Sequence, residues 1–159
     1  MENSKQQEVK IRKAKYEDLE QICDIYTEAF DGQTTESTRQ WWNILDNDHY
    51  HYYVVEQDGL VVAVASLIVI NKLIRGGNRV ALIEDVAVSR YAGSRGIGKM
   101  LIEKLKEVAI EKKCYKTILN CSEDVVGFYE KCGFYKKEVQ MRWDRPAEFA
   151  PSARNNKLF

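Results

Sequence analysis

The chain has 159 residues, which is enough for one domain with a single core and short for two. Hydrophobic residues make up 45% of it and charged residues 30%, which excludes disordered, collagen-like and fibrous classes. Lys plus Arg and Asp plus Glu both number 24, so the formal net charge is zero. A dedicated nucleic-acid binder or membrane-surface binder would carry an excess of one sign, so we expect neither partner.

The ends of the chain and its cysteines predict a soluble protein of a reducing compartment. Residues 1–8 are polar, with no apolar stretch of a secretory signal, and we expect a flexible tail there and a cytoplasmic location. No apolar run is long enough to span a bilayer. The four cysteines form no C-x-x-C pair, and we interpret them as small apolar fillers. His49 and His51 are the only histidines, so we expect no metal site.

The first half of the chain predicts two helices and three strands. Residues 9–13 alternate as in an edge strand, and apolar residues from Leu19 to Phe30 recur at helical spacing before Asp31-Gly32. A second helix is expected after Thr34-Thr35, with Trp41, Trp42 and Leu45 as its apolar residues. Residues 50–56 and 60–70 are expected to form strands around a tight Asp58-Gly59 turn. A basic, glycine-broken loop follows at 71–79.

The second half continues with an apolar strand at 80–88, a loop at 89–96 and a helix at 97–112. We expect a short strand at 117–121, a helix that begins at Ser122 and stops at Gly133, and a last strand at about 134–143. These elements predict one α/β domain of mixed topology over residues 9–143, followed by an irregular tail at 144–159.

Glu84 and Asp85 are adjacent carboxylates inside an otherwise apolar strand. Burying them is costly unless a ligand or a partner compensates. Strand side chains alternate between faces, so both acids could face one side only if the strand carries a β-bulge. The alternative is a partly exposed strand end with solvated acids.

Two further segments could carry chemistry. Gly93-Ser94-Arg95-Gly96-Ile97-Gly98-Lys99 lies between a strand and a helix, where free N–H groups suit a phosphate, although many such turns need glycine for geometry alone. It is neither a Walker A loop nor a dinucleotide fingerprint. In the Phe128–Phe134 segment, Phe128 is expected to pack in the core. Successive residues of a helix lie about 100° apart around its axis, so Tyr129 points in a different direction from Phe128 and could reach a cleft.

Together the acidic strand, the glycine loop, the long helix, the short strand and Phe-Tyr-Glu-Lys-Cys-Gly-Phe (128–134) resemble the GNAT superfamily of acetyl-CoA-dependent N-acetyltransferases. The resemblance covers residues 9–143 and implies a central mixed, largely antiparallel sheet flanked by helices. More narrowly, Ile-Glu-Asp-Val-Ala-Val (83–88) and Cys-Tyr-Lys (114–116) are similar to the glucosamine-6-phosphate N-acetyltransferases. This implies acetyl transfer from acetyl-CoA to the amine of glucosamine 6-phosphate, on the route to UDP-N-acetylglucosamine.

The resemblance also implies residue roles. Glu84 and Asp85 would bind the sugar and assist loss of the ammonium proton, and Tyr129 would protonate the departing thiolate or donate a hydrogen bond to it. Attack would be direct, without an acyl-enzyme. The acetyl-CoA contacts implied are Val86, Ala87, Val88, Ser94, Arg95, Gly96, Ile97, Gly98, Lys99, Asn120 and Tyr129. The substrate contacts implied, besides Glu84, Asp85 and Val86, are Lys72, Leu73, Ile74, Arg75, Tyr115 and Lys116. The last two would come from the partner subunit of a homodimer.

The chain departs from the family pattern at three places. Gly93 stands where Gln or Arg usually begins the glycine loop, and Asn120 stands in place of an acidic residue. Asp144 stands in place of an arginine, although Arg142 and Arg145 lie close to it in the sequence. Two rival functions stay open. One is a GNAT enzyme acting on a polyamine, an antibiotic or a protein N-terminus, and the other is a non-catalytic acyl-CoA-binding regulator. The basic loop favours an anionic acceptor.

Overall fold

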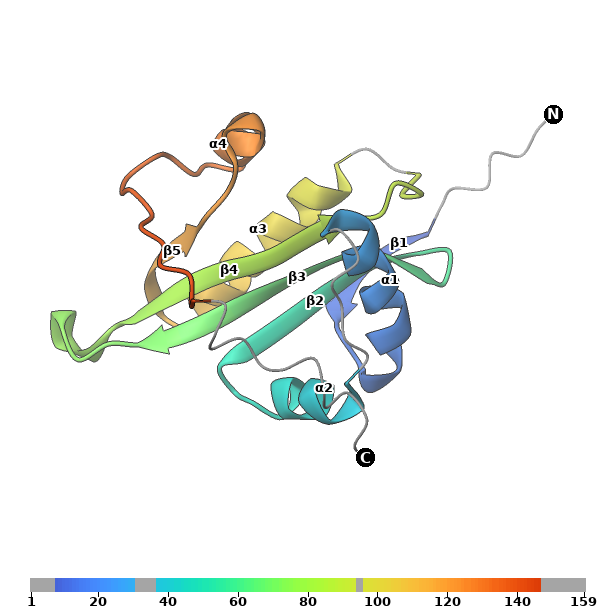
Figure 1. The fold of residues 1–159 in the computed structure, drawn as a ribbon, viewed down its shortest axis with the longest axis horizontal. Coiled ribbons are helices and arrows are strands. Elements are labelled where there is room, and N and C mark those ends of the chain that lie inside the picture. The colour runs from blue at the N-terminus through green and yellow to red at the C-terminus, as the bar shows by residue number, and fades with distance from the viewer. Residues whose placement is uncertain (1–7, 31–36, 94–95, 147–159) are drawn as a thin grey trace.

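The computed structural model describes residues 8–30, 37–93 and 96–146. Five strands form one sheet in the order β1-β2-β3-β4-β5. The first three pairings are antiparallel, and β5 runs parallel to β4. This is the mixed, largely antiparallel sheet expected from the sequence (Figure 1). The strands are β1 (Val9–Lys13), β2 (Tyr50–Gln57), β3 (Leu60–Asn71), β4 (Arg79–Val88) and β5 (Cys114–Leu119).

Helices cover both faces of the sheet, as Figure 1 shows. On one face lie α1 (Leu19–Ala29) and α2 (Thr38–Leu45), and on the other lies α3 (Ile97–Glu111). Alternate residues of β2 and β3 divide between two apolar clusters. Val54 and Val64 pack with α1 and α2, while Val55 and Ala65 pack with α3. This double cover explains why β3 is apolar along nearly its whole length.

Several predictions are confirmed. Asp58 and Gly59 both adopt positive φ, 50° and 85°, as a tight primed hairpin turn requires. The predicted inner face of the long helix is buried at Ile97, Leu101, Leu105 and Val108. The helix predicted from Ser122 begins as a 3-10 turn (Glu123–Val125), continues as α4 (Val126–Lys131), and ends before Gly133 with φ 86°.

Other boundaries differ. β5 begins at Cys114, three residues before the predicted start, because Lys116 pairs with Val80 in the parallel ladder. Ser37 caps α2 by accepting a hydrogen bond from the N–H of Gln40 at 3.3 Å. The expected caps Thr34 and Thr35, and the Asp31-Gly32 stop, lie outside the described residues.

The strand predicted at 134–143 is wrong for the isolated chain. Residues 134–146 are irregular in the structure and join no sheet. Val139, Met141 and Trp143 alternate with polar residues, as in a strand, but their side chains are exposed. The alternation gives a segment a possible apolar face, whereas a strand also needs a partner for its backbone. Within the described chain this segment has none.

Candidate active site

β4 carries a β-bulge at its acidic pair. Ser66 pairs with Glu84, and Val64 pairs with Ala87, so one residue of β3 stands opposite both Asp85 and Val86. Cross-strand partners share a face, which puts Glu84 on the same face as Ala87, although the two are three residues apart. Asp85 adopts φ 53°, a left-handed conformation that costs a non-glycine residue free energy. The bulge thus resolves the problem posed by two adjacent acids in an apolar strand.

Both carboxyl groups have pKa values above the ordinary range. Burial raises the pKa of Glu84, and the neighbouring Asp85 carboxylate adds to the effect. Burial also raises the pKa of Asp85, although its side chain stays accessible from the open side of the pocket that it lines. Carboxyl groups of this kind in a cleft are candidates for proton transfer.

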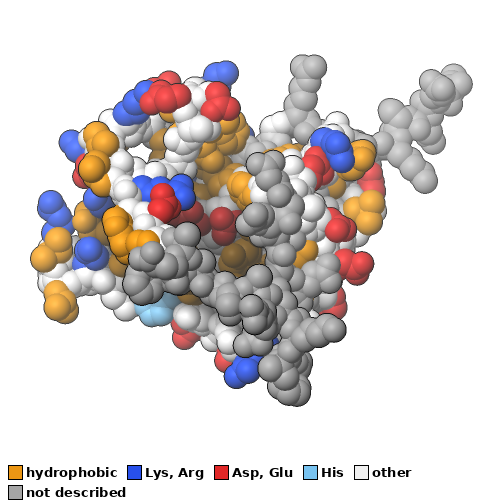
Figure 2. Space-filling view, viewed as in Figure 1, with side chains coloured by type: hydrophobic (Ala, Val, Ile, Leu, Met, Phe, Trp, Pro, Cys, Tyr) orange, Lys and Arg blue, Asp and Glu red, His pale blue; other side chains and the backbone are white. Residues whose placement is uncertain are grey.

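A pocket of about 370 Å³ lies between α1, α2 and the sheet, and Asp85 forms part of its floor. Figure 2 shows acidic atoms at the bottom of a hollow on this face. Apolar side chains make up much of its wall, among them Leu19, Ile22 and Trp41. The Trp41 indole is held in place because its N–H donates to the carbonyl of Tyr16 at 3.1 Å and its ring meets Tyr52 edge to face.

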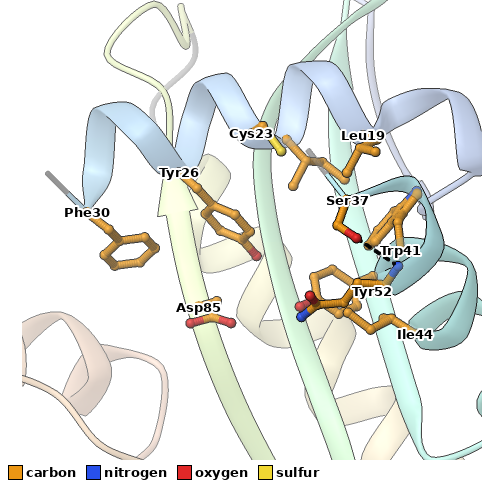
Figure 3. Close-up of a pocket in the computed structure, with 11 residues that line it drawn as sticks. Leu19, Cys23, Tyr26, Phe30, Ser37, Trp41, Ile44, Tyr52 and Asp85 are labelled. Carbon is orange, nitrogen blue, oxygen red and sulfur yellow. Dashed lines mark hydrogen bonds between the residues drawn. The ribbon is translucent and has the colours of Figure 1, made fainter. Parts of the chain in front are cut away.

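Two tyrosines enter this pocket together with Asp85 (Figure 3). Tyr26 comes from α1 and Tyr52 from β2. Burial raises the pKa of both, and Asp85 adds to each shift. The sequence pattern does not mark them as site residues, because Tyr26 fits the apolar stripe of its helix. The phenolic oxygen within that stripe was the available signal.

A second opening lies between β4 and β5. Their ladder ends at Ile83 and Leu119, and beyond it the two strands diverge (Figure 1). Val86, Ala87 and Val88 therefore have no β5 partner on that side. The ladder ends because β4 bulges at Asp85 and β5 stops at Leu119. A diverging strand pair of this kind offers backbone N–H and C=O groups to an extended ligand.

The start of α3 lies near this opening. Gly96 adopts φ 87° and is the N-cap of the helix. In the described part of the loop, Ile97 is buried, Gly98 is partly buried and Lys99 is exposed. Ser94 and Arg95 lie outside the described residues. A helix of 15 residues led by glycine presents free N–H groups and a partial positive charge at its N-terminus.

Tyr129 is half-buried on α4 between two other rings. It meets Phe128 with ring centroids 5.0 Å apart and Phe134 with centroids 6.1 Å apart, both edge to face. Burial raises the pKa of Tyr129, so its hydroxyl stays protonated at neutral pH and can donate. Asn120, just past the end of β5, is exposed.

The basic loop stands apart from the pocket at the far end of the β3–β4 hairpin. Lys72, Leu73, Ile74 and Arg75 are all exposed. The Arg75 guanidinium lies over the Tyr115 ring, 5.6 Å from its centroid, so the loop contacts the start of β5. Lys116 also lies over the Tyr115 ring and pairs weakly with Glu138 at 3.9 Å. Figure 2 shows Lys and Arg side chains gathered at this end. The loop and Tyr115–Lys116 are thus brought together, but not around Asp85.

The histidines and cysteines form no metal centre in the part of the chain that the structure describes. His51 is buried, and burial, followed by Lys112, lowers its pKa. His49 contacts the carbonyl of Val69 through Nδ1 at 2.7 Å. None of the four cysteines, all of which lie in described segments, forms a disulfide. Cys23 and Cys132 are buried fillers as expected, whereas Cys121 is exposed.

The fold and the site together define an acetyltransferase domain, as similarity to solved structures indicates. A Trypanosoma brucei acetyltransferase superposes with a TM-score of 0.78 at 34% identity, covering 87% of this chain and 100% of that one. A glucosamine-6-phosphate N-acetyltransferase from Arabidopsis thaliana superposes with a TM-score of 0.79 at 28% identity, covering 86% of this chain and 98% of that one.

The sequence profile of the Acetyltransferase (GNAT) family matches residues 19–134, and the chain belongs to this family. A glucosamine 6-phosphate N-acetyltransferase of Candida albicans is 40% identical over 63% of this chain and 67% of its own length. The enzyme of that name from Trypanosoma brucei brucei is 48% identical over 54% of this chain and 58% of its own. Across the first five curated relatives, the matches span 49–67% of their lengths.

Proposed function

We propose that this chain transfers the acetyl group of acetyl-CoA to the amine of glucosamine 6-phosphate. The observation that carries the proposal is the bulge of β4, which brings two carboxylates to one face beside a pocket and leaves Val86 to Val88 without a β5 partner. The names of the relatives give the acceptor: several are glucosamine 6-phosphate N-acetyltransferases.

The acidic pair has the chemistry that an amine acceptor needs. An amine must lose a proton before its lone pair can attack a thioester carbonyl. In this proposal Glu84 and Asp85 bind the sugar and accept that proton, directly or through water. Their raised pKa values make them better bases than ordinary surface carboxylates. The nitrogen adds to the thioester carbon and the C–S bond then breaks, with no acyl-enzyme. The nitrogen loses its second proton in this step, which balances the proton that Tyr129 gives to the thiolate.

The diverging strands and the start of α3 fit acetyl-CoA as the second substrate. Val86, Ala87 and Val88 pair with the pantetheine arm as a strand would, and the Val86 N–H stabilises the negative charge that develops on the thioester oxygen. Residues 94–99, with Gly96 and Gly98 permitting close approach, bind the pyrophosphate at the helix N-terminus. Asn120 contributes a further polar contact. Tyr129, neutral and half-buried, donates its proton to the leaving thiolate.

The basic loop is assigned to the phosphate of the acceptor. Lys72 and Arg75 are exposed cations that lie far along the hairpin from Asp85 in the single chain, so they serve a neighbouring copy more readily than their own pocket. Leu73 and Ile74, exposed between them, fit a contact with that copy. Tyr115 and Lys116 join the same cluster.

This arrangement supports a homodimer with shared active sites. β5 is an edge strand, and the irregular segment 134–146 holds Val139, Met141 and Trp143 in solvent. Association with a second copy would bury these side chains and pair the free edge of β5, and both effects would stabilise the dimer. Light scattering should show a dimer, and Val139→Lys with Met141→Lys should shift it toward monomer. A wild-type chain that stays monomeric at micromolar concentration would contradict the homodimer.

The function is tested by thiol release with acetyl-CoA and one of three acceptors: glucosamine 6-phosphate, glucosamine or spermidine. Turnover only with the phosphorylated sugar supports the proposal. Turnover with spermidine alone would favour a different small-amine acetyltransferase. Binding of acetyl-CoA without turnover on any amine would favour a regulatory role. The cytoplasmic location stays a prediction; in the described residues no helix has both the length and the apolar character to cross a membrane.

A further inference from the structure

Tyr26 places a buried hydroxyl beside the acidic floor of the pocket. Its oxygen interacts with the nearby Tyr52 hydroxyl but has no hydrogen-bond partner within 3.5 Å among the described residues, and Figure 3 shows it pointing from α1 toward Asp85. A buried hydroxyl without a partner costs folding free energy, and phenylalanine would fill the same space without that cost. An unpaired donor in a ligand pocket therefore indicates a partner supplied by the ligand.

The surroundings of Tyr26 define what that partner is. Burial, with Tyr52 and Asp85 nearby, raises the pKa of Tyr26, so its hydroxyl keeps its proton at neutral pH. It is thus a hydrogen-bond donor, while the Asp85 carboxylate in its ionised form is only an acceptor. The two groups face the same space without bonding to each other. A ligand that fits between them must offer a donor to Asp85 and an acceptor to Tyr26.

An ammonium group with a hydroxyl on the next carbon has this complementarity. The amine donates to Asp85, and the neighbouring hydroxyl oxygen accepts from Tyr26. The opposite wall, with Leu19, Ile22 and Trp41, is apolar and matches the carbon face of a sugar ring. In glucosamine 6-phosphate the amine carbon has hydroxyl-bearing carbons on both sides.

We propose that Tyr26 is a specificity-determining residue that donates a hydrogen bond to the acceptor hydroxyl next to the amine, while Asp85 accepts from the amine itself. The inference rests on the proposed function and deepens it. In this proposal Tyr26 makes the pocket selective for 1,2-amino alcohols. The selectivity therefore comes from α1 and not from the acidic strand or the glycine loop.

The test pairs a variant with modified substrates. We would measure kcat/KM of the wild type and of Tyr26→Phe for glucosamine 6-phosphate and for its 1-deoxy and 3-deoxy analogues. The wild type should prefer the full substrate to one of the analogues by about tenfold, the worth of one hydrogen bond. Tyr26→Phe should lose about tenfold on the full substrate and nearly nothing on that analogue, so the preference disappears.

Two controls separate this role from a structural one. Tyr53 lies on β2 but faces α3, on the other side of the sheet from the pocket. Tyr53→Phe should therefore keep the wild-type preference for the full substrate over the deoxy analogue. The melting temperature of Tyr26→Phe should stay close to that of the wild type, because the Tyr26 hydroxyl has no partner within 3.5 Å among the described residues.

The outcomes are distinct. If the wild type does not acetylate glucosamine 6-phosphate, the proposed function fails and the inference fails with it. If the wild type turns over and Tyr26→Phe keeps full discrimination against both analogues, only the inference is overturned. A marked fall in the melting temperature of Tyr26→Phe, with the preference unchanged, would assign the hydroxyl to structure.

Discussion

Gly98 at the start of α3 leaves no room for a side chain beside the Phe128 ring of α4. A β-carbon built at residue 98 would lie 3.2 Å from Cζ of Phe128 and 3.6 Å from Cγ2 of Val88. The absence of a side chain at Gly98 therefore lets the Phe128 ring lie against the first turn of α3. Phe128 in turn contacts Tyr129, so the packing of a glycine sets the position of the proposed proton donor.

This contact predicts the effect of Gly98→Ala. The added methyl group requires the Phe128 ring to shift by a few tenths of an ångström, and this ring contacts the Tyr129 ring. Alanine also favours the helix by about 1 kcal/mol, so the melting temperature should change little. We expect kcat to fall by about tenfold through displaced Tyr129. Gly127→Ala, where a β-carbon meets nothing within 4 Å, is the matched control. Equal rates for both variants and the wild type would contradict the coupling.

Tyr129→Phe should lower kcat by about 100-fold, the usual worth of a positioned proton donor, and leave acetyl-CoA binding within about twofold. Thiol release gives the rate and calorimetry gives the dissociation constant. Tyr135→Phe removes a hydroxyl from a neighbouring tyrosine that is 76% exposed and should behave as wild type. An unchanged kcat in Tyr129→Phe would remove the residue from the chemistry.

Asp85→Asn should lower the pKa of Glu84. The pKa of Glu84 is raised by burial and then by the Asp85 carboxylate, and the substitution removes the second cause but keeps the first. The Glu84 carboxyl should therefore ionise at a lower pH than in the wild type, though still above an ordinary glutamate. Carbon-13 NMR titration of the glutamate side chains measures this. Turnover should fall in Asp85→Asn, and also in Glu84→Gln, while acetyl-CoA still binds. A Glu84 titration that does not move would show that the two carboxylates do not interact.

Arg75→Ala and Lys72→Ala should raise KM for glucosamine 6-phosphate by about 10- to 100-fold, because each would remove a charge-assisted bond to phosphate. Their kcat/KM for unphosphorylated glucosamine should not change. Lys10→Ala, on β1 at the opposite edge of the sheet, controls for the loss of one positive charge. Equal losses on the phosphorylated and the unphosphorylated sugar would separate the loop from phosphate binding.

The Arg12–Asp18 pair predicts a pH-dependent stability. Asp18 accepts hydrogen bonds from the Arg12 guanidinium at 2.7 and 2.9 Å and from the Lys15 N–H at 2.7 Å. Burial opposes ionisation of Asp18, but these bonds outweigh it and its pKa is lowered. As pH falls, Asp18 therefore becomes protonated in the unfolded chain at a higher pH than in the folded chain. The stabilisation is complete above the unfolded pKa and is lost as pH drops through the lower folded pKa.

Asp18→Asn should accordingly lower the free energy of unfolding at pH 7 by about 2 kcal/mol. The difference from wild type should shrink in acid, where wild-type Asp18 is itself protonated. Urea unfolding between pH 7 and pH 3 measures both values. Asp24→Asn, an exposed acid on α1, is the control. A difference that stays constant over this range would rule out ionisation of Asp18 as its source.

The local pattern of the sequence determined most of the elements. Helical spacing placed α1 and α3, the Asp58-Gly59 pair placed the hairpin turn, and the apolar run at 60–70 indicated the strand β3. Each depends on neighbours within a few residues, so periodicity and turn chemistry are sufficient. The acidic pair, too, was recognisable as a candidate site, because carboxylates in an apolar strand are costly.

Only the tertiary structure decided how these elements meet. From the sequence, Glu84 and Asp85 could face one side of the sheet only if the strand carried a β-bulge. The pairing of Ser66 with Glu84 and of Val64 with Ala87 shows that it does. Tyr26 became a site residue only when α1 docked across β4, since its spacing alone fits a core stripe. The strand predicted at about 134–143 does not form in the single chain. A side-chain pattern is a property of one segment, whereas pairing, register and the content of a pocket depend on contacts between segments far apart in the chain.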